Sequence, residues 1–408
     1  MTALIIFRLP HVVEDNGATP YILMYNSRSR LLAVCHRITM TLRRGSPVPI
    51  EGWNPEMPPL DVMPPGSGFA PLRGAPGGGS PPSEDKVAGR LTLAEADSWQ
   101  LLRKLSAAST VEPCQGVALA TADAFHWLAS APDACLSACV TDPPYGLIEY
   151  EQKDHAKMKI GRGGVWRIPP SFDGAERAPV PRFTVLTALD RKRLNHFFRV
   201  LAGHIFRTLV PGGHVIIASN PLLSTNTFAC FEQAGFEKRG EIIRLVQTLR
   251  GGDRPKGAES EFGDVTVMPR ACWEPWGLFR KPISEKTVSA NLRRWGTGGL
   301  RRLSAGEPFR DVIESAPTGP RERAISPHPS LKPQRFMRQI VRAVLPLGIG
   351  VVFDPFTGGG STLAASAHLG YKAIGTELDQ DYAKAASRAI PLLRDLQSHP
   401  PSKRAASE

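Results

Sequence analysis

The 408-residue sequence lacks long apolar runs and closely paired cysteines. No apolar stretch approaches the roughly 20 residues that cross a bilayer, and residues 3–7 (ALIIF) are too short and lack the basic lead of a signal peptide. The 6 cysteines contain no C-x-x-C pair, so they suggest no disulfide framework and are expected to be reduced and mostly buried. We therefore expect a cytoplasmic protein without a membrane partner or a bound metal.

Regular periodicity is also absent from the first hundred residues. Residues 46–84 are dense in proline and glycine, which predicts a disordered linker, and residues 1–110 as a whole are expected to form a weakly ordered extension. From residue 111 onwards, strand patterns alternate with helical ones, which predicts an α/β fold with a doubly wound, mostly parallel sheet. The clearest strands are expected at 136–141, 214–219 and 241–249, and the clearest helices at 187–209, 222–234, 333–344 and 380–396. Residues 250–327 interrupt the pattern, and residues 397–408 are expected to be a disordered tail.

The strand expected at 136–141 leads into the segment D-P-P-Y, Asp142 to Tyr145. Neither proline can donate a backbone hydrogen bond, and Pro143 disfavours the helical region for Asp142. The chain is therefore expected to leave the sheet in a stiff, extended loop that presents the Asp142 carboxylate, the Pro143 carbonyl and the Tyr145 ring. The alternative is that Asp142 only caps a turn and Tyr145 only packs within the loop.

A glycine-rich turn follows a second apolar strand, in the segment VVFDPFTGGGSTL that starts at Val351. Glycines let the backbone approach a ligand closely, and the start of the following helix favours negative groups. The spacing matches neither G-x-G-x-x-G nor a phosphate-binding P-loop. Asp354 offers a carboxylate to a cationic or amino-bearing ligand, and Glu377 ends the next strand, where an acid binds ribose hydroxyls. The pair favours a nucleoside-type cofactor over the alternative of plain strand–helix packing.

Three segments in this order, D-P-P-Y, H-P-S-L-K-P (328–333) and D-P-F-T-G-G-G (354–360), resemble the DNA amino-methyltransferases that use S-adenosylmethionine. Because the D-P-P-Y segment comes before the cofactor segment, the resemblance is to the circularly permuted (beta-class) members. It implies a seven-stranded, Rossmann-like methyltransferase sheet with a small, irregular target-recognition insert. The implied domains are a catalytic half (111–249), the last strands with the insert (250–327) and a cofactor-binding half (328–396). The chain departs from the family at Ala122, where glycine is frequent, and in the order of residues in the glycine turn.

The resemblance also implies roles for individual residues. Asp142 and the Pro143 carbonyl would bind the two hydrogens of an exocyclic amino group, so that its nitrogen attacks the sulfonium methyl directly. Pro144 would keep the loop rigid, and Tyr145 would stack on a base flipped out of the duplex. For His328, contact with the ligand and a plain turn role stay equally open. The implied cofactor-binding residues are Asp123, His328, Lys332, Pro333, Asp354, Phe356, Gly358, Gly360, Ser361 and Glu377.

Positive charge exceeds negative charge, with a formal net charge of +12, which favours a polyanionic partner without identifying one. Two basic segments lie outside the motifs, one after D-P-P-Y and one in the insert region. A solvated basic surface is the alternative for each of them. The candidate DNA-binding residues are Lys157, Lys159, Arg162, Arg293, Arg294, Arg301 and Arg302.

We therefore expect a site-specific methyltransferase acting on adenine N6 in double-stranded DNA. The adenine preference depends on Asp142, because cytosine-N4 members often carry serine in its place. Cytosine N4 is the first alternative. An RNA or protein-amide methylase is less favoured because its cofactor motif usually comes first, and a DNA-binding relic would require a damaged motif. A homodimer and a cognate restriction enzyme stay open.

Overall fold

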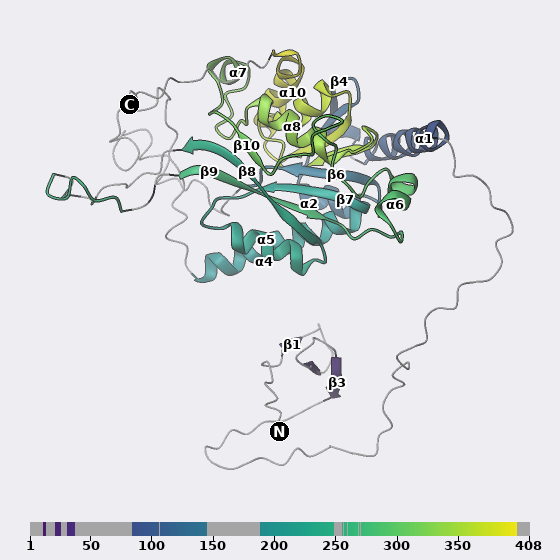
Figure 1. Cartoon of the computed structure of the whole chain (residues 1–408), viewed down its shortest axis with the longest axis horizontal. Helices are drawn as coiled ribbons and strands as arrows, with labels where there is room; N and C mark the ends of the chain where they lie inside the picture. Colours follow the sequence, from purple (N-terminus) through teal and green to yellow (C-terminus); the bar gives the residue numbers. More distant parts are fainter. Residues whose placement is uncertain are drawn as a thin grey trace, which may run out of the picture. The chain divides into compact units, whose positions relative to one another are not determined.

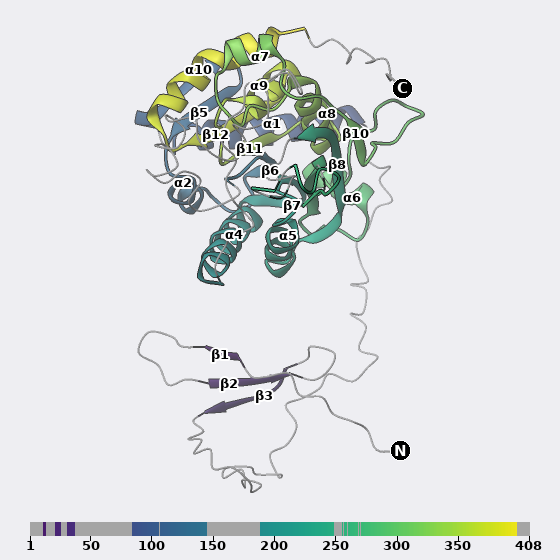
Figure 2. The same cartoon turned by 90° about the vertical axis from the view of Figure 1, so that its left-hand side faces the viewer.

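The structure is a computed structural model of the whole chain, and it divides into two units, Met1–Gly79 and Ser80–Glu408. It describes residues 11–13, 21–25, 31–36, 84–105, 107–144, 188–248, 255, 257–258, 260–267, 269 and 271–397. In the first unit, strands β1 (His11–Val13), β2 (Tyr21–Tyr25) and β3 (Leu31–His36) form an antiparallel sheet in that order (Figure 2). The proline- and glycine-rich linker and the expected tail from residue 398 lie outside the described residues.

The second unit is built on a sheet of nine described strands in the order β10-β8-β9-β7-β6-β11-β12-β5-β4. Strands β6 to β10 of this sheet are labelled in Figure 1. The run β7-β6-β11-β12-β5 is parallel, whereas β9 is antiparallel to both neighbours and β4 is antiparallel to β5. The mostly parallel, Rossmann-like sheet is thus confirmed, but the short edge strands β4 and β10 exceed the expected count of seven. The strands are β4 (Thr110–Cys114), β5 (Val117–Thr121), β6 (Leu136–Thr141), β7 (Leu209–Ala218), β8 (Glu237–Thr248), β9 (Ala271–Arg280), β10 (Val312–Glu314), β11 (Val351–Asp354) and β12 (Lys372–Glu377).

Helices cover both faces of the sheet, as the doubly wound pattern predicts (Figure 2). Helices α2, α4 and α5 pack on one face around Trp127, Phe198 and Phe231, and helices α8, α9 and α10 pack on the other face around residues such as Phe336 and Leu363. The helices are α1 (Glu84–Leu102), α2 (Ala124–Ser130), α4 (Ala188–Thr208), α5 (Ser224–Gln233), α6 (Val288–Trp295), α7 (Pro320–Ile325), α8 (Gln334–Val344), α9 (Ser361–His368) and α10 (Gln380–Asp395), with a short 3-10 turn at Ala107–Ser109. Among these described elements, no helix combines the length and apolarity that crossing a membrane requires.

Helix α1 corrects the expectation that residues 1–110 form one weakly ordered extension. Trp99 and Leu102 are buried in the same core cluster as α2 and α4. Glu95 accepts a hydrogen bond from the Gly350 backbone N–H at 3.1 Å and lies 3.4 Å from the Lys372 ammonium. The helix therefore belongs to the folded unit. The prediction missed this helix because its sequence is mostly charged and small residues directly after the linker, and only a few large side chains mark its buried face.

The other predicted elements are largely confirmed. Strand β6 has the predicted bounds, and α4, α5, α8 and α10 each lie within two residues of theirs. The prediction differs at Pro211–Gly213, which was expected to end a helix but lies inside β7, where Gly212 adopts φ +81°. Cys135, Cys139 and Cys230 are free thiols and are buried, as expected.

Candidate active site

The predicted motif residues meet at one edge of the sheet, where the parallel strands β5, β12, β11 and β6 end. These strands end at Thr121, Glu377, Asp354 and Thr141, and the register pairs Glu377 directly with Thr121. The carboxyl edge of such a sheet is where α/β proteins bind ligands. The structure therefore brings the two acidic loops that the sequence singles out to the same edge.

Asp354 lies at the centre of this edge and is only 2% exposed. It accepts a hydrogen bond from the Thr141 hydroxyl at 2.7 Å and another from the Phe356 backbone N–H at 3.1 Å. Burial raises the pKa of Asp354 to about 6, although these donors oppose the rise. The Thr141 bond links the strand that precedes Asp142 to the strand that precedes the glycine turn.

The glycine turn is fixed by Glu377 and by its own backbone conformation. Gly358 (φ +49°) donates its backbone N–H to the Glu377 carboxylate at 2.8 Å, and Gly360 (φ +87°) is the N-cap of α9. A Cβ added at Gly358 would lie 2.9 Å from the His328 ring. Glycine is therefore required there by both the left-handed φ and the lack of space.

Lys332 is the cation at the centre of a buried charge network. Its ammonium pairs with Asp142 Oδ2 and lies 3.6 Å from Glu274 Oε1, and Glu274 accepts a hydrogen bond from Arg244 at 2.6 Å. The four side chains are between 5% and 16% exposed. Burial disfavours the charged ammonium, but Asp142 and then Glu274 outweigh it, so the pKa of Lys332 is raised above its usual value. The network joins two cations to two carboxylates.

Glu274 and Arg244 were missed by the sequence prediction. They come from β9 and β8, and the antiparallel register places Arg244 directly opposite Glu274. Arg244 is further fixed by the Ser315 hydroxyl at 3.0 Å and the Ala316 carbonyl at 2.9 Å. No motif marks either residue in the sequence, because only the strand pairing brings them to Lys332.

The H-P-S-L-K-P segment is anchored to the start of α9. The Lys332 backbone N–H donates to the Ser361 hydroxyl at 3.0 Å, and Pro333 is the N-cap of α8. The His328 ring packs edge-on against Tyr382, with 4.6 Å between ring centroids. Burial and, second, Lys332 lower the pKa of His328 to about 4, so its ring is neutral at pH 7. The segment thus covers the glycine turn.

Asp123 and Phe356 lie on the side of α2 and α4. Asp123 is the N-cap of α2, and its carboxylate accepts hydrogen bonds from the Phe125 and His126 backbone N–H groups, each at 2.9 Å. The Phe356 ring lies nearly parallel to Phe197 of α4, with 6.0 Å between the centroids. Asp123 therefore has a capping role in addition to the predicted one.

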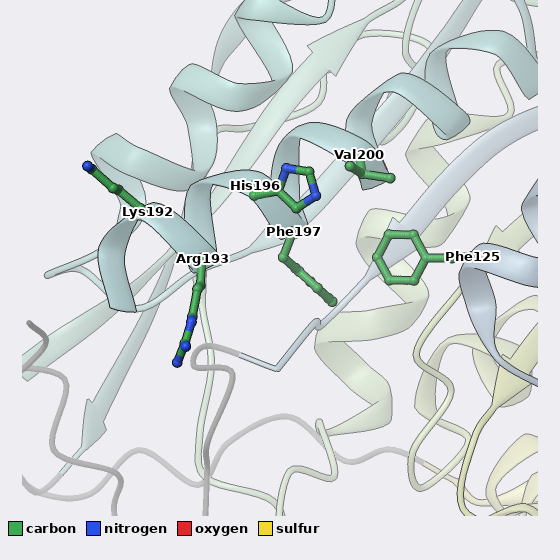
Figure 3. A pocket seen from close by; sticks show the side chains of 6 residues that line it. All are labelled: Phe125, Lys192, Arg193, His196, Phe197 and Val200. Atoms are coloured by element: carbon green, nitrogen blue, oxygen red, sulfur yellow. The ribbon is translucent and has the colours of Figure 1, made fainter. Parts of the chain in front are cut away.

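A cavity of about 640 Å³ opens beside these rings, between α2 and the first half of α4 (Figure 3). The Phe125 and Phe197 rings form its apolar side, with 5.1 Å between their centroids. Because α4 leads into the amino end of β7, its first half lies toward the carboxyl edge. The sequence prediction missed this basic rim, since α4 shows only the amphipathic pattern of a packed helix. The remaining lining residues are Lys192, Arg193, His196 and Val200.

The four arginines predicted to contact DNA from the insert lie at the opposite, amino edge of the sheet. The Asn291 amide of α6 donates to the Pro211 carbonyl near the start of β7, at 3.0 Å. Arg301 donates to the hydroxyl of Tyr371, the residue before β12, at 2.8 Å, and Arg294 pairs with Glu285 at 2.7 Å. A six-residue strand such as β6 separates the two edges by about 20 Å. Arg293, Arg294, Arg301 and Arg302 therefore do not join the site, and their contact with DNA stays a prediction that this geometry does not support.

The remaining predicted residues fall outside the described part of the chain. Tyr145 follows the last described residue of its loop, Pro144, and Lys157, Lys159 and Arg162 belong to the segment after it. Their roles stay predictions. Within the described residues, no group of three His, Cys, Asp or Glu side chains is arranged to hold a metal ion.

Comparison with known proteins agrees with this site. Residues 275–388 match the N6_N4_Mtase family model, described as DNA methylase; the match includes the segment from His328 to Pro333 and the glycine turn, but not Asp142. The type II methyltransferase M2.DpnII of Streptococcus pneumoniae is 29% identical over 91 residues, which are 22% of this chain and 34% of that protein. The chain thus matches about a third of that relative's length. The resemblance to the N6/N4 amino-methyltransferase family is confirmed over the matched residues.

Two solved structures are similar to parts of this chain. The protein TTHA0409 of Thermus thermophilus, in a structure complexed with S-adenosyl-L-methionine, is 21% identical with a TM-score of 0.44, over 68% of this chain and 94% of that one. The PvuII DNA methyltransferase, described as cytosine-N4-specific, is 13% identical with a TM-score of 0.45, over 70% and 88%. The fold assignment here follows from the strand order and directions rather than from these likenesses.

Proposed function

We propose that the protein is an S-adenosylmethionine-dependent DNA methyltransferase that methylates the exocyclic N6 of adenine. The observation that carries the proposal is the meeting of two loops at one sheet edge, joined by the Thr141–Asp354 hydrogen bond. One loop presents Asp142 on a proline-stiffened backbone, and the other is a glycine turn before a helix. Asp142 comes before the glycine turn along the chain, which supports the circularly permuted class.

The residues at the glycine turn fit S-adenosylmethionine. Glu377 ends β12, where an acid binds ribose hydroxyls, and the N-terminus of α9 favours a carboxylate. Asp354 supplies a carboxylate that would pair with a cationic or amino-bearing group, and the absence of a side chain at Gly358 lets the turn pass directly beneath the His328 ring. When bound, this cofactor supplies an electrophilic methyl group on a sulfonium.

Asp142 and the Pro143 carbonyl are the proposed acceptors for the two hydrogens of the target amino group. Such hydrogen bonds favour a tetrahedral nitrogen whose lone pair is no longer delocalised into the ring, so that it can attack the methyl group in line. Lys332 already holds one oxygen of Asp142, which positions the carboxylate before the base arrives. Positioning and electrostatics then supply most of the rate acceleration.

The proposed polyanionic partner is double-stranded DNA. The exposed cations Lys192 and Arg193 lie on the first half of α4, toward the carboxyl edge, where they can hold phosphates beside the target. The target base would leave the duplex to reach Asp142, with Tyr145 stacking on it. A homodimer, a cognate restriction enzyme and a cytoplasmic location stay predictions.

The base itself is the finer part of the proposal. Asp142 favours adenine, because cytosine-N4 members of the family often have serine in its place. The matching family model covers both acceptors, so cytosine N4 is the second candidate.

The test is digestion of plasmid DNA to nucleosides after incubation with the protein and methyl-labelled S-adenosylmethionine. We expect label in N6-methyladenine with the wild type and with the control Asp381→Asn, an exposed acid on α10, but not with Asp142→Asn. Equilibrium dialysis with the labelled cofactor should show binding by all three proteins. Label in N4-methylcytosine instead would change only the assigned target base, from adenine to cytosine. Bound cofactor without label in DNA would refute a DNA substrate.

A further inference from the structure

A second cavity, of about 330 Å³, lies toward the amino edge of the sheet, whereas Asp142 follows the carboxyl end of β6. It is on the α8 face, between the strands β7, β8 and β9 and the loop that follows α6. Its volume is within the range of small-ligand sites, about 300–1,000 Å³. Its lining combines cations with apolar side chains; those used below are His214, Arg239, Leu278, Arg280, Arg302 and Phe309.

Three guanidinium groups line this cavity, and two of them lie next to the Glu237 carboxylate. Arg280 is 8% exposed, and its Nε and Nη2 both donate to Glu237 Oε2, at 2.9 and 2.6 Å. Arg239 lies 3.9 Å from the same carboxylate oxygen. Arg302 is exposed and forms no ion pair with any residue that the structure describes. The cavity therefore carries an excess of positive charge that Glu237 does not neutralise.

His214 adds a buried polar atom whose hydrogen bonding is incomplete. The residue is 3% exposed and lines the cavity, and its Nδ1 has no hydrogen-bond partner among the described residues. It lies directly opposite Arg280 in the β7–β9 pairing. Burial, then Arg280 and Arg239, lower the pKa of His214 to about 3, so the ring is neutral and can donate from one nitrogen. An unpaired buried polar atom costs free energy, which an accepting anion would recover.

We propose that this cavity binds a phosphate-bearing ligand of mononucleotide size. Guanidinium groups match phosphate oxygens with paired, charge-assisted hydrogen bonds, and His214 supplies a further donor. Leu278 and Phe309 provide apolar surface for the organic part of the ligand. The phosphate comes either from a free nucleotide or from a nucleic-acid strand. The proposal goes beyond methyl transfer and does not depend on it.

The probe for the test is adenosine monophosphate, titrated calorimetrically into the full-length protein. We expect Arg302→Gln to weaken binding at least tenfold, and Arg388→Gln, an exposed arginine of α10 outside the cavity, to change it less than twofold. His214→Phe keeps the ring but removes both nitrogens, and it should weaken binding similarly if its melting temperature shows that it folds. Arg302 is exposed, so we expect Arg302→Gln to fold, and this variant tests the proposal whether or not His214→Phe folds.

Two further arms interpret the result. Glu377→Gln alters the proposed cofactor site. If this variant weakens nucleotide binding while Arg302→Gln leaves it unchanged, the nucleotide binds at the cofactor site and the proposal is overturned. The proposal would also be overturned if the wild type and Arg302→Gln bound the nucleotide equally well and bound inorganic phosphate equally well. Water would then be the hydrogen-bond partner of His214 Nδ1. A 20-base-pair duplex that displaces the nucleotide from the wild type identifies DNA as the phosphate source; failure to displace it identifies a free nucleotide.

Discussion

The replacement Asp354→Asn should make the protein more stable at neutral pH. Asp354 has its pKa raised from the ordinary 3.8 to about 6 by burial, so the folded protein binds this proton more tightly than the unfolded chain. Stability therefore falls as the pH rises from about 4 to about 6, because the carboxylate must ionise while buried. The difference between the two pKa values corresponds to about 3 kcal/mol. The asparagine oxygen can still accept from Thr141, so the replacement removes this loss without breaking the bond.

The assay is urea unfolding at pH values between 4 and 8. Tryptophan fluorescence is a suitable probe, because Trp127 stacks on Phe353, next to Asp354, at 4.7 Å between ring centroids. At pH 7.5 we expect Asp354→Asn to exceed the wild type by up to about 3 kcal/mol, with little difference at pH 4. Asp381→Asn, at an exposed site, should follow the wild type throughout. If Asp354→Asn were less stable than the wild type at pH 7.5, the reasoning would be refuted. Independently of stability, we expect Asp354→Asn to bind the proposed cofactor poorly.

Three further changes test other parts of the structure. Lys332→Met leaves two buried carboxylates without their shared cation and should cost about 3–5 kcal/mol of stability, measured by thermal unfolding; an equal loss with Lys332→Arg would show that packing rather than charge is responsible. Gly375→Ala places a Cβ 2.2 Å from a threonine hydroxyl and should cost about 1–3 kcal/mol, whereas Gly306→Ala meets nothing within 4 Å and should be neutral in the same denaturant titration. The double change Lys192→Gln with Arg193→Gln should weaken binding of a fluorescent DNA duplex. The slope of log affinity against log salt concentration should fall by the amount expected for about two lost phosphate contacts. If the same change at the two arginines of α6 has the larger effect, DNA binds at the amino edge instead.

The parts of the site that follow from local sequence were predictable. The bounds of β6, the stiff loop at Asp142 and the glycine turn before α9 each depend on neighbouring residues: an apolar run, two prolines, or glycines with positive φ. The meeting of Asp354 and Glu377 followed as well, because parallel strands that alternate with helices must end at one edge of the sheet. These features needed no knowledge of distant contacts.

The parts that depend on strand pairing or on loop direction were not predictable. Glu274 reaches Lys332 only because β8 and β9 pair in a register that also brings Arg244 opposite it. Arg301 and Arg302, which follow α6, are in the insert expected from the resemblance, but β9 is antiparallel and delivers the chain to the amino edge, where its last residue Arg280 pairs with His214. Position along the chain says which elements a loop joins, and it does not say at which end of the sheet the loop lies.

The bond between Thr141 and Asp354 joins residues 213 positions apart, and this separation has a consequence during synthesis. Ribosomes add about 5–20 residues per second, so Thr141 exists for roughly 10 to 40 seconds before its partner is made. Throughout that interval β6 lacks β11, one of its two neighbours in the sheet, and for most of it Asp142 also lacks Lys332. A chain that is interrupted before β11 therefore carries half of the catalytic edge and no glycine turn. Unfinished copies cannot act on DNA by the proposed reaction, because its last parts are made only near the end of translation.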